Sequence, residues 1–140
     1  AAGSMLGSGA IVVIDERACM VQVALRVAAF YKHESCGKCT PCREGTGWLV
    51  QLLERIEDGE GTQADLDLLR DVCERIEGKS LCALGDFAVW CVASYVDKFY
   101  DEFKRHVDEG GCPFGGASSI DGVLAPSDTH VHKHLPLVSA

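Results

Sequence analysis

The most informative stretch of the sequence is Glu34-Ser35-Cys36-Gly37-Lys38-Cys39-Thr40-Pro41-Cys42-Arg43-Glu44-Gly45, in which three cysteines follow a C-x-x-C-x-x-C spacing. Three thiols this close together can reach one metal centre, and Gly37 allows the backbone to fold tightly around it. Three such cysteines with a fourth from elsewhere are a common ligand set for a [4Fe–4S] cluster. Chance clustering is the weaker interpretation, because compact cysteine runs in a chain without a secretory signal usually indicate metal or redox chemistry.

A fourth thiolate must come from one of the remaining cysteines, which are Cys19, Cys73, Cys82, Cys91 and Cys112. Three of them fall on apolar faces of expected helices, where a free cysteine is usually a small buried apolar residue. Cys112 lies past the last expected helix and is a weaker candidate. Cys82 lies in an expected loop, 40 residues after Cys42. We therefore predict Cys36, Cys39, Cys42 and Cys82 as the metal ligands.

Zinc is the competing metal, bound by four cysteines in a structural or assembly module. Zinc sites favour two paired C-x-x-C knuckles or mixed Cys/His sets, whereas this sequence has one triplet and one distant cysteine. The spacing therefore favours iron–sulfur over zinc. Lys38 and Arg43 lie between or beside the ligands, where a positive charge can stabilise a reduced, anionic cluster. Simple surface charge is an equally good interpretation of these two residues.

Length and composition indicate one modest domain without a membrane span. The chain has 140 residues, of which 47% are hydrophobic, and a formal net charge of −8. This charge argues against a nucleic-acid partner. The sequence contains no apolar run long enough for a transmembrane helix, so direct membrane insertion is not expected. Eight cysteines without a signal peptide indicate a reducing compartment.

Apolar residues at helical spacing predict four helices, over residues 17–33, 41–58, 63–77 and 86–107. Asp15 or Glu16 is expected to complement the start of the first, and Thr40 and Thr62 to cap the second and third. The apolar face of the second helix is expected to consist of Trp48, Leu49, Leu52, Leu53 and Ile56. One face of the fourth helix is expected to be lined by Cys91, Tyr95, Phe99 and Phe103. Short connections between four amphipathic helices predict an antiparallel four-helix bundle, in which the loops before the second and fourth helices can meet at one end.

The two ends of the chain differ from this helical region. Glycines and the apolar run at residues 10–14 predict a turn and one strand, which we interpret as the end of a β domain covering residues 1–15. The bundle is expected to occupy residues 16–111. Residues 112–140 have no clear period and predict a tail that is partly disordered. Its His130, His132 and His134 are compatible with metal binding, but a polar tail is the better interpretation.

These residues resemble the NADH-binding flavoprotein subunit of respiratory complex I (NADH–quinone oxidoreductase). The resemblance rests on the cysteine motif, on the glycine-rich start followed by a strand, on Gly78-Lys79-Ser80-Leu81-Cys82-Ala83-Leu84-Gly85-Asp86, and on Phe99-Tyr100-Asp101-Glu102-Phe103. It covers roughly residues 1–114 in order. The cysteine motif is highly specific, although diaphorase subunits of NAD-reducing hydrogenases and formate dehydrogenases share it.

The resemblance implies a mainly α fold, a four-helix bundle holding a [4Fe–4S] cluster, preceded by a remnant strand of a ubiquitin-like β-grasp domain. It implies that Cys36, Cys39, Cys42 and Cys82 match the cluster ligands, and that NADH-reduced FMN delivers the electrons. The implied partners are a [2Fe–2S] subunit and a large multi-cluster subunit, in a peripheral arm on the cytoplasmic side of the membrane, which pass electrons towards quinone.

The sequence departs from the family in one respect that limits its activity. The family's glycine-rich flavin and NADH loops belong to an earlier domain, and this sequence has no G-x-G-x-x-G and no glycine-rich loop before a helix. We therefore expect a C-terminal piece of the flavoprotein that relays electrons as part of the enzyme complex and does not oxidise NADH alone. The rivals are a diaphorase fragment, a zinc module and a fragment that does not fold independently.

Overall fold

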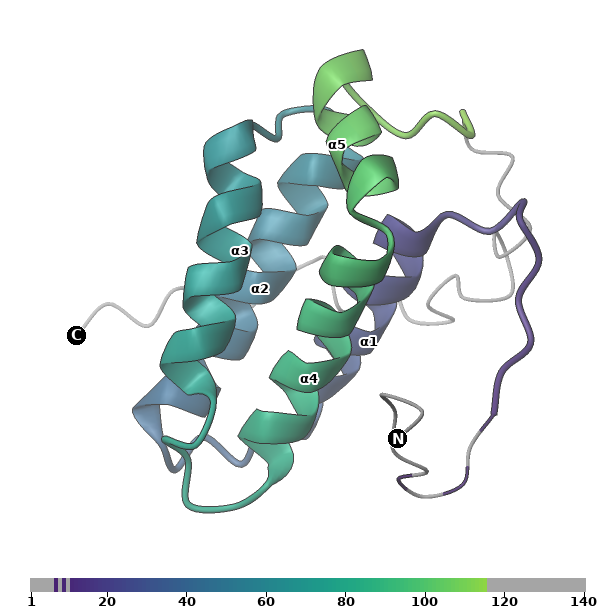
Figure 1. Cartoon of the computed structure of the whole chain (residues 1–140). Coiled ribbons are helices and arrows are strands. Elements are labelled where there is room, and N and C mark those ends of the chain that lie inside the picture. Colours follow the sequence, from purple (N-terminus) through teal and green to yellow (C-terminus); the bar gives the residue numbers. More distant parts are fainter. Residues whose placement is uncertain (1–6, 8, 10, 116–140) are drawn as a thin grey trace.

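A computed structural model of the chain describes residues 7, 9 and 11–115 (Figure 1). The described part is helical, and its five helices are α1 (Met20–Glu34), α2 (Thr40–Glu57), α3 (Gln63–Ile76), α4 (Leu84–Lys98) and α5 (Tyr100–Glu109). The first four run alternately down and up, and α5 extends α4 upward past the ends of its neighbours (Figure 1). The predicted mainly α bundle is confirmed. Among the described residues, no helix combines the length and apolar character needed to cross a membrane.

The core consists mainly of aliphatic side chains from α1 to α4, and Phe103 joins it from α5. Helix α3 buries five apolar residues at helical spacing, namely Leu66, Leu69, Val72, Cys73 and Ile76. The residues predicted for the apolar face of α2 are also buried, except for Trp48, which is 53% exposed. Thr62 caps α3 as predicted, because its hydroxyl accepts from the Asp65 amide and the Asp65 carboxylate accepts from the Thr62 amide.

Gly45 allows α2 and α3 to pack closely near the lower end of the bundle. A Cβ atom at this position would occupy the space of the Ile76 side chain, which is itself buried. The glycine in the sequence motif therefore has a packing role, because it lets the first turns of α2 lie directly against the last turn of α3.

The predicted strand at residues 10–14 is wrong for the part that the structure describes. Residues 11–14 have no regular structure, and Ile11, Val12 and Val13 are 80%, 78% and 93% exposed. A strand needs a neighbour to pair with, and the described residues contain no other strand. The tail histidines His130, His132 and His134 lie outside the described residues, as does residue 10.

The first two helices begin differently from the prediction. Helix α1 starts at Met20, not near residue 17, because Asp15 closes a separate turn by accepting from the amides of Arg17 and Ala18. Its N-cap is Cys19, whose sulfur accepts from the Gln22 amide. Helix α2 has Cys39 at the N-cap position instead of Thr40, with a proline in the first turn as expected.

The predicted fourth helix is two helices. The chain leaves helical geometry at Phe99, with φ −120° and ψ 28°, and α5 begins at the next residue. Residues spaced by four drift around a helix by roughly 40° per step, so one straight helix cannot keep Cys91, Tyr95, Phe99 and Phe103 on one face. The break leaves Phe99 38% exposed while Phe103 is fully buried.

Candidate metal centre

Two cysteine-bearing loops meet at the lower end of the bundle (Figure 1). One joins α1 to α2 and carries Cys36 and Cys39, and the other joins α3 to α4 and carries Cys82. The Leu81 amide donates to the Cys39 sulfur at 3.4 Å, so the loops are in direct contact. The predicted meeting of these loops is therefore confirmed, although Cys82 is 40 residues from the triplet.

The start of α2 sets the arrangement of the triplet. Cys39 is the N-cap and Cys42 lies in the first turn, three residues later, so both side chains project from the same side of the helix. Cys36 precedes them on the loop, where Gly37 has φ +75°, a conformation that other residues rarely adopt. The three thiols therefore follow a tight turn into a helix N-terminus, where amide groups favour anionic ligands.

The donors at this end fit an iron–sulfur cluster chemically. All eight cysteines of the chain are free thiols in the structure, so none of the four predicted ligands is held in a disulfide. They offer four soft sulfur donors, the ligand class that iron–sulfur clusters take. Cys36 and Cys82 are exposed, Cys39 is half-buried and Cys42 is buried.

The polar contacts around the triplet hold the loop in shape. Arg43 Nη1 donates to the Gly37 carbonyl at 2.8 Å, and Arg43 Nε pairs with Glu44 at 2.8 Å. The Ser35 hydroxyl lies 3.3 Å from the Cys42 sulfur, and the Gly37 amide donates to the Ser35 hydroxyl at 3.4 Å. Arg43 thus ties the turn to α2, while Glu44 compensates part of its charge.

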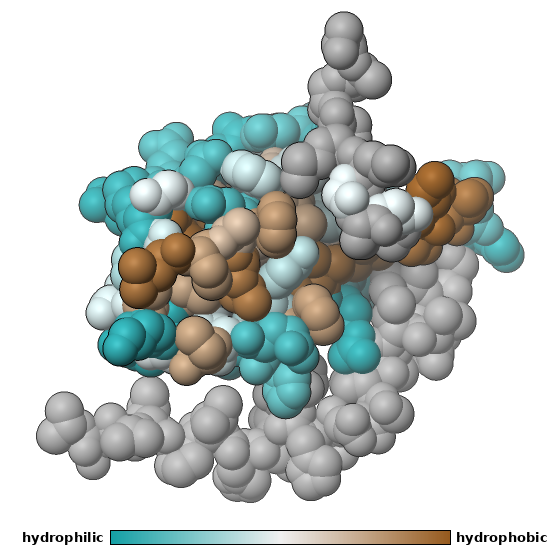
Figure 2. Space-filling model, turned by 90° about the horizontal axis from the view of Figure 1, so that it is seen from below, coloured by the Kyte–Doolittle hydropathy of each residue, from teal (hydrophilic) through white to brown (hydrophobic). Residues whose placement is uncertain are grey.

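Apolar side chains surround the loops on this end of the molecule. Figure 2 views the bundle from this end and shows hydrophobic residues, in brown and tan, on this face among more hydrophilic ones. Leu81 is 82% exposed, and Phe87 and Trp90 are 40% and 44% exposed. The two rings pack edge to face at 5.8 Å, and the Trp90 indole donates to Glu77 at 2.6 Å. These contacts hold the two rings in place, and we refer to Leu81, Phe87 and Trp90 together as the exposed apolar patch.

Two of the other cysteines occupy packed positions, as predicted. Cys73 is buried in α3, and its burial, followed by the nearby charges of Asp97 and Glu77, raises its pKa to about 12. Cys91 is half-buried beside Tyr31, and burial raises the pKa of its thiol as well. Cys73 therefore packs in the hydrophobic core, and Cys91 is a half-buried thiol of α4.

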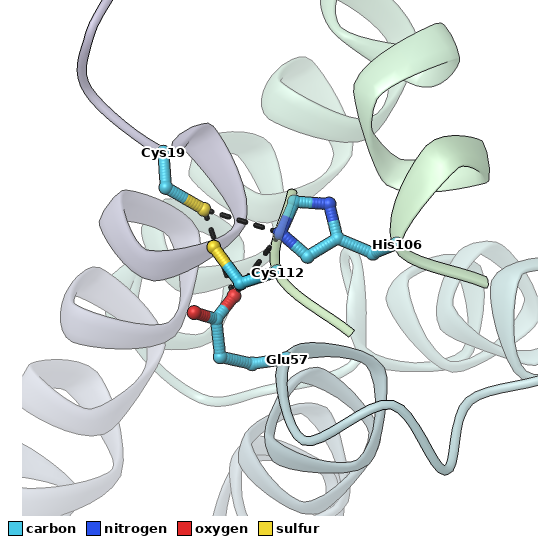
Figure 3. Close-up of side chains that lie close together, drawn as sticks. All are labelled: Cys19, Glu57, His106 and Cys112. Atoms are coloured by element: carbon cyan, nitrogen blue, oxygen red, sulfur yellow. Dashed lines mark hydrogen bonds and ion pairs between the residues drawn. The ribbon is translucent and has the colours of Figure 1, made fainter. Parts of the chain in front are cut away.

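Cys19 and Cys112 belong to a cluster that sequence reasoning missed. With Glu57 and His106 they form a group at the opposite end of the bundle whose ligand atoms all lie within 4.8 Å of one another (Figure 3). Burial lowers the pKa of His106, but hydrogen bonds to Glu57 and to the Glu102 carbonyl outweigh it, so the net shift is upward. Glu57 shows the converse: burial raises its pKa, but hydrogen bonds from His106 and Gln22 lower it overall.

Comparison with known proteins establishes the family. The chain matches the family described as the NADH-ubiquinone oxidoreductase-F iron-sulfur binding region over residues 22–106. This range includes all four predicted ligands. The match indicates an iron–sulfur protein of the respiratory oxidoreductase class. The chain belongs to this family.

Individual relatives agree with this assignment. The chain is 53% identical over 120 residues to the F subunit of NADH-quinone oxidoreductase from Mycobacterium tuberculosis (strain ATCC 25618 / H37Rv), a match that covers 86% of the chain and 27% of the relative. It is 54% identical over 119 residues to the same protein of Streptomyces coelicolor, covering 85% and 26%. The chain therefore spans about a quarter of the length of these curated relatives, and the resemblance to the flavoprotein of NADH–quinone oxidoreductase is confirmed.

A solved structure matches the fold. The crystal structure of an NAD+-reducing [NiFe]-hydrogenase in the H2-reduced state aligns with a TM-score of 0.57 and 29% identity, covering 87% of this chain and 22% of that chain. The helical arrangement thus also occurs in an oxidoreductase other than the respiratory complex.

Proposed function

We propose that this chain is an electron-relay module of an NADH–quinone oxidoreductase, in which Cys36, Cys39, Cys42 and Cys82 bind one [4Fe–4S] cluster. The observation that carries this proposal is the contact between the two cysteine-bearing loops, in which the Leu81 amide donates to the Cys39 sulfur. It puts the backbone beside Cys82 against the triplet, as a shared ligand set requires. The match to an iron–sulfur binding family over this region supports the same ligands.

The residues around the loops have separable roles in this proposal. The bound cluster would accept and release one electron at a time. The Leu81 amide and the start of α2 direct N–H groups towards the thiolate ligands, which stabilises their negative charge. Arg43 holds the turn through the Gly37 carbonyl, and we propose that Arg43 and Lys38 add positive charge that favours the reduced state.

We propose that the electrons come from FMN reduced by NADH, both bound outside this chain. The next acceptor is then an iron–sulfur cluster of a neighbouring subunit, on the path towards quinone. The [2Fe–2S] subunit and the large multi-cluster subunit are the proposed partners, in a peripheral arm on the cytoplasmic side of the membrane. The exposed patch of Leu81, Phe87 and Trp90 supports a protein partner at this end, because exposed apolar groups beside a redox site favour docking.

We propose further that residues 1–15 belong to a β-grasp domain, residues 16–111 to the cluster-binding bundle and residues 112–140 to a tail. The exposed run Ile11, Val12 and Val13 supports the first boundary, because such apolar side chains gain stability when another domain covers them. The turn that Asp15 forms with Arg17 and Ala18 before α1 begins supports a linker at this point.

A diaphorase role is the second candidate function. The fold match to an NAD+-reducing hydrogenase favours it. The cluster ligands and the relay step are the same in both candidates, and they differ in the subunit that receives or supplies the electron. Co-purification with the neighbouring subunits therefore separates them.

The ligand assignment is tested by a pair of cysteine variants. Cys82→Ser should abolish cluster assembly, so that iron and acid-labile sulfide fall to near zero after anaerobic purification. Cys73→Ser is the matched control, since Cys73 is buried in α3 and should affect packing only. Equal iron content in the two variants would disprove the assignment of Cys82. Zinc in place of iron in the parent chain would favour an assembly module.

A further inference from the structure

Four side chains of types that can bind a metal ion converge at the end of the bundle opposite the cluster loops (Figures 1 and 3). Each comes from a different part of the chain. Cys19 is the N-cap of α1, Glu57 is the last residue of α2, His106 lies in α5, and Cys112 follows α5. Nothing in the proposed electron relay uses any of them.

The donor atoms in this group are within reach of a single ion. His106 Nε2 lies 3.3 Å from the Cys19 sulfur and 3.2 Å from Glu57 Oε2. The Cys19 sulfur lies 3.6 Å from Glu57 Oε2, and no pair in the group, Cys112 included, is separated by more than 4.8 Å. Tetrahedral ligands bound at the usual zinc distances of about 2.0–2.3 Å are separated by similar amounts, so only small side-chain shifts are needed.

The contacts behind the donors orient them towards one point. His106 Nδ1 lies 2.9 Å from the Glu102 carbonyl, so it donates there and directs Nε2 at the group. Metal-binding histidines usually have such a backbone partner. The Gln22 side chain donates to Glu57 Oε1 at 2.7 Å and leaves Oε2 facing inward. The Gln22 amide donates to the Cys19 sulfur at 3.4 Å, which holds this sulfur at the start of α1.

We propose that Cys19, Glu57, His106 and Cys112 form a second metal site, which binds one zinc ion and has a structural role. Two thiolates, an imidazole and a carboxylate complete four-coordination, the closed arrangement of structural zinc. Binding would release the thiol protons and any proton on His106 Nε2 to solvent. The ion changes no oxidation state.

A purely hydrogen-bonded cluster explains the geometry less well. Cys19 and His106 are fully buried, and a buried charged pair gains little net stability over apolar packing unless further partners satisfy it. Gln22 and the Glu102 carbonyl satisfy Glu57 and His106, but these hydrogen bonds give no reason for two thiols at the same point, which a metal ion would use as ligands. A bound cation turns the same four groups into a stabilising set.

The site would fix α5 to the bundle. This helix has only 10 residues, and Phe103 and His106 are its buried residues. Helices this short are marginal without tertiary contacts. An ion bound by His106 and Cys112 together with Cys19 and Glu57 would join α5 and the segment after it to the ends of α1 and α2, far from the cluster loops.

This proposal is tested by measuring the zinc and iron contents of variants of the full chain, which should lose the two metals separately. The unmodified chain, purified anaerobically, should contain about one zinc ion in addition to its iron. Cys112→Ser should lose zinc and retain iron, and Cys82→Ser should lose iron and retain zinc. Cys91→Ser is the matched control, because Cys91 is a half-buried thiol outside both sites, and it should retain both metals.

Titration of the purified, metal-free chain with Co²⁺ tests the same site without depending on the metal that the protein acquired in the cell. A Cys36→Ser/Cys39→Ser/Cys42→Ser/Cys82→Ser variant should bind one Co²⁺ with the intense visible absorption of tetrahedral thiolate ligation. Adding Cys112→Ser or the isosteric Glu57→Gln should weaken binding at least tenfold, with circular dichroism confirming that helices persist. If the unmodified chain binds neither zinc nor cobalt here, or if Cys112→Ser binds as tightly as Cys91→Ser, the proposal is wrong.

Discussion

The two ends of the bundle use cysteine in opposite ways. At the lower end, Cys36 and Cys82 are exposed on loops, and Cys39 and Cys42 lie where a helix begins. At the upper end, Cys19 is fully buried beside His106 and Glu57, and burial raises the pKa of its thiol far above the usual range. The number of thiols therefore does not define a site. Exposure and the neighbouring donors separate a cluster-binding loop from a compact group suited to one ion.

Thiol reactivity should differ most strongly between these two environments. In the metal-free native chain, a negatively charged thiol reagent should modify Cys36 and Cys82 first. Cys73 and Cys19 should react at least about a hundredfold more slowly, since both are buried and protonated. Mass spectrometry of timed, digested samples measures each site. In denaturant all eight thiols should react alike, and rapid native labelling of Cys19 would show that the upper end is open.

Removal of the His106 side chain, at the upper end of the bundle, should lower the free energy of unfolding more than any single substitution in a loop. His106→Ala should lower the free energy of unfolding by about 3 kcal/mol, because it creates a cavity and leaves Glu57 without its buried partner. Chemical denaturation in chelator measures the change without metal. His33→Ala is the matched control: His33 is an exposed residue near the end of α1, and its loss should cost less than about 0.5 kcal/mol. Similar losses in the two variants would contradict the buried role of His106.

A substitution that disturbs the packing of α2 against α3, near the cluster loops, should cost less stability than the loss of His106. Gly45→Ala should cost about 2 kcal/mol, because the added methyl group would occupy the space of the buried Ile76 side chain. Gly47→Ala lies in the same helix, where the nearest atom is 4.0 Å away at the flexible end of Lys32. It should be neutral or stabilising through helix propensity. Thermal unfolding of both variants separates packing from propensity, and equal effects would mean that α2 and α3 are not closely packed there.

Loss of a helix cap should have the smallest effect. Thr62→Ala removes the hydroxyl that accepts from the Asp65 amide at the start of α3. We expect a cost of about 1 kcal/mol in the free energy of unfolding. Thr62→Ser should retain most of the stability, since serine caps a helix in the same way. A serine variant as unstable as the alanine variant would assign the effect to lost packing of the methyl group.

Local patterns explain what could be predicted from the sequence. The cysteine triplet lies within seven residues, so its chemistry can be interpreted without a fold. Thr62 and Asp65 are three residues apart, and the stripe of α3 repeats at helical spacing, so cap and core face followed directly. The loop of Cys82 could be placed because short connections force antiparallel neighbours to return to the same end.

Non-local contacts explain what the sequence did not reveal. The cluster at the upper end joins Cys19 to Glu57 and His106, which lie 38 and 87 residues away. Its members are single residues without a shared motif, and only the packing of α1, α2 and α5 brings them together. The break at Phe99 was also missed, because a four-residue apolar repeat can be read as one helix face although it drifts around the helix.

The most direct test of the central claim is the iron and acid-labile sulfide content of the anaerobically purified chain, with an EPR spectrum after reduction by dithionite. We predict about four irons and about four sulfides per chain with the signal of a reduced [4Fe–4S] cluster. Cys82→Ser should lose that signal. A folded chain with no iron, or with zinc at both ends of the bundle, would contradict the electron-relay account.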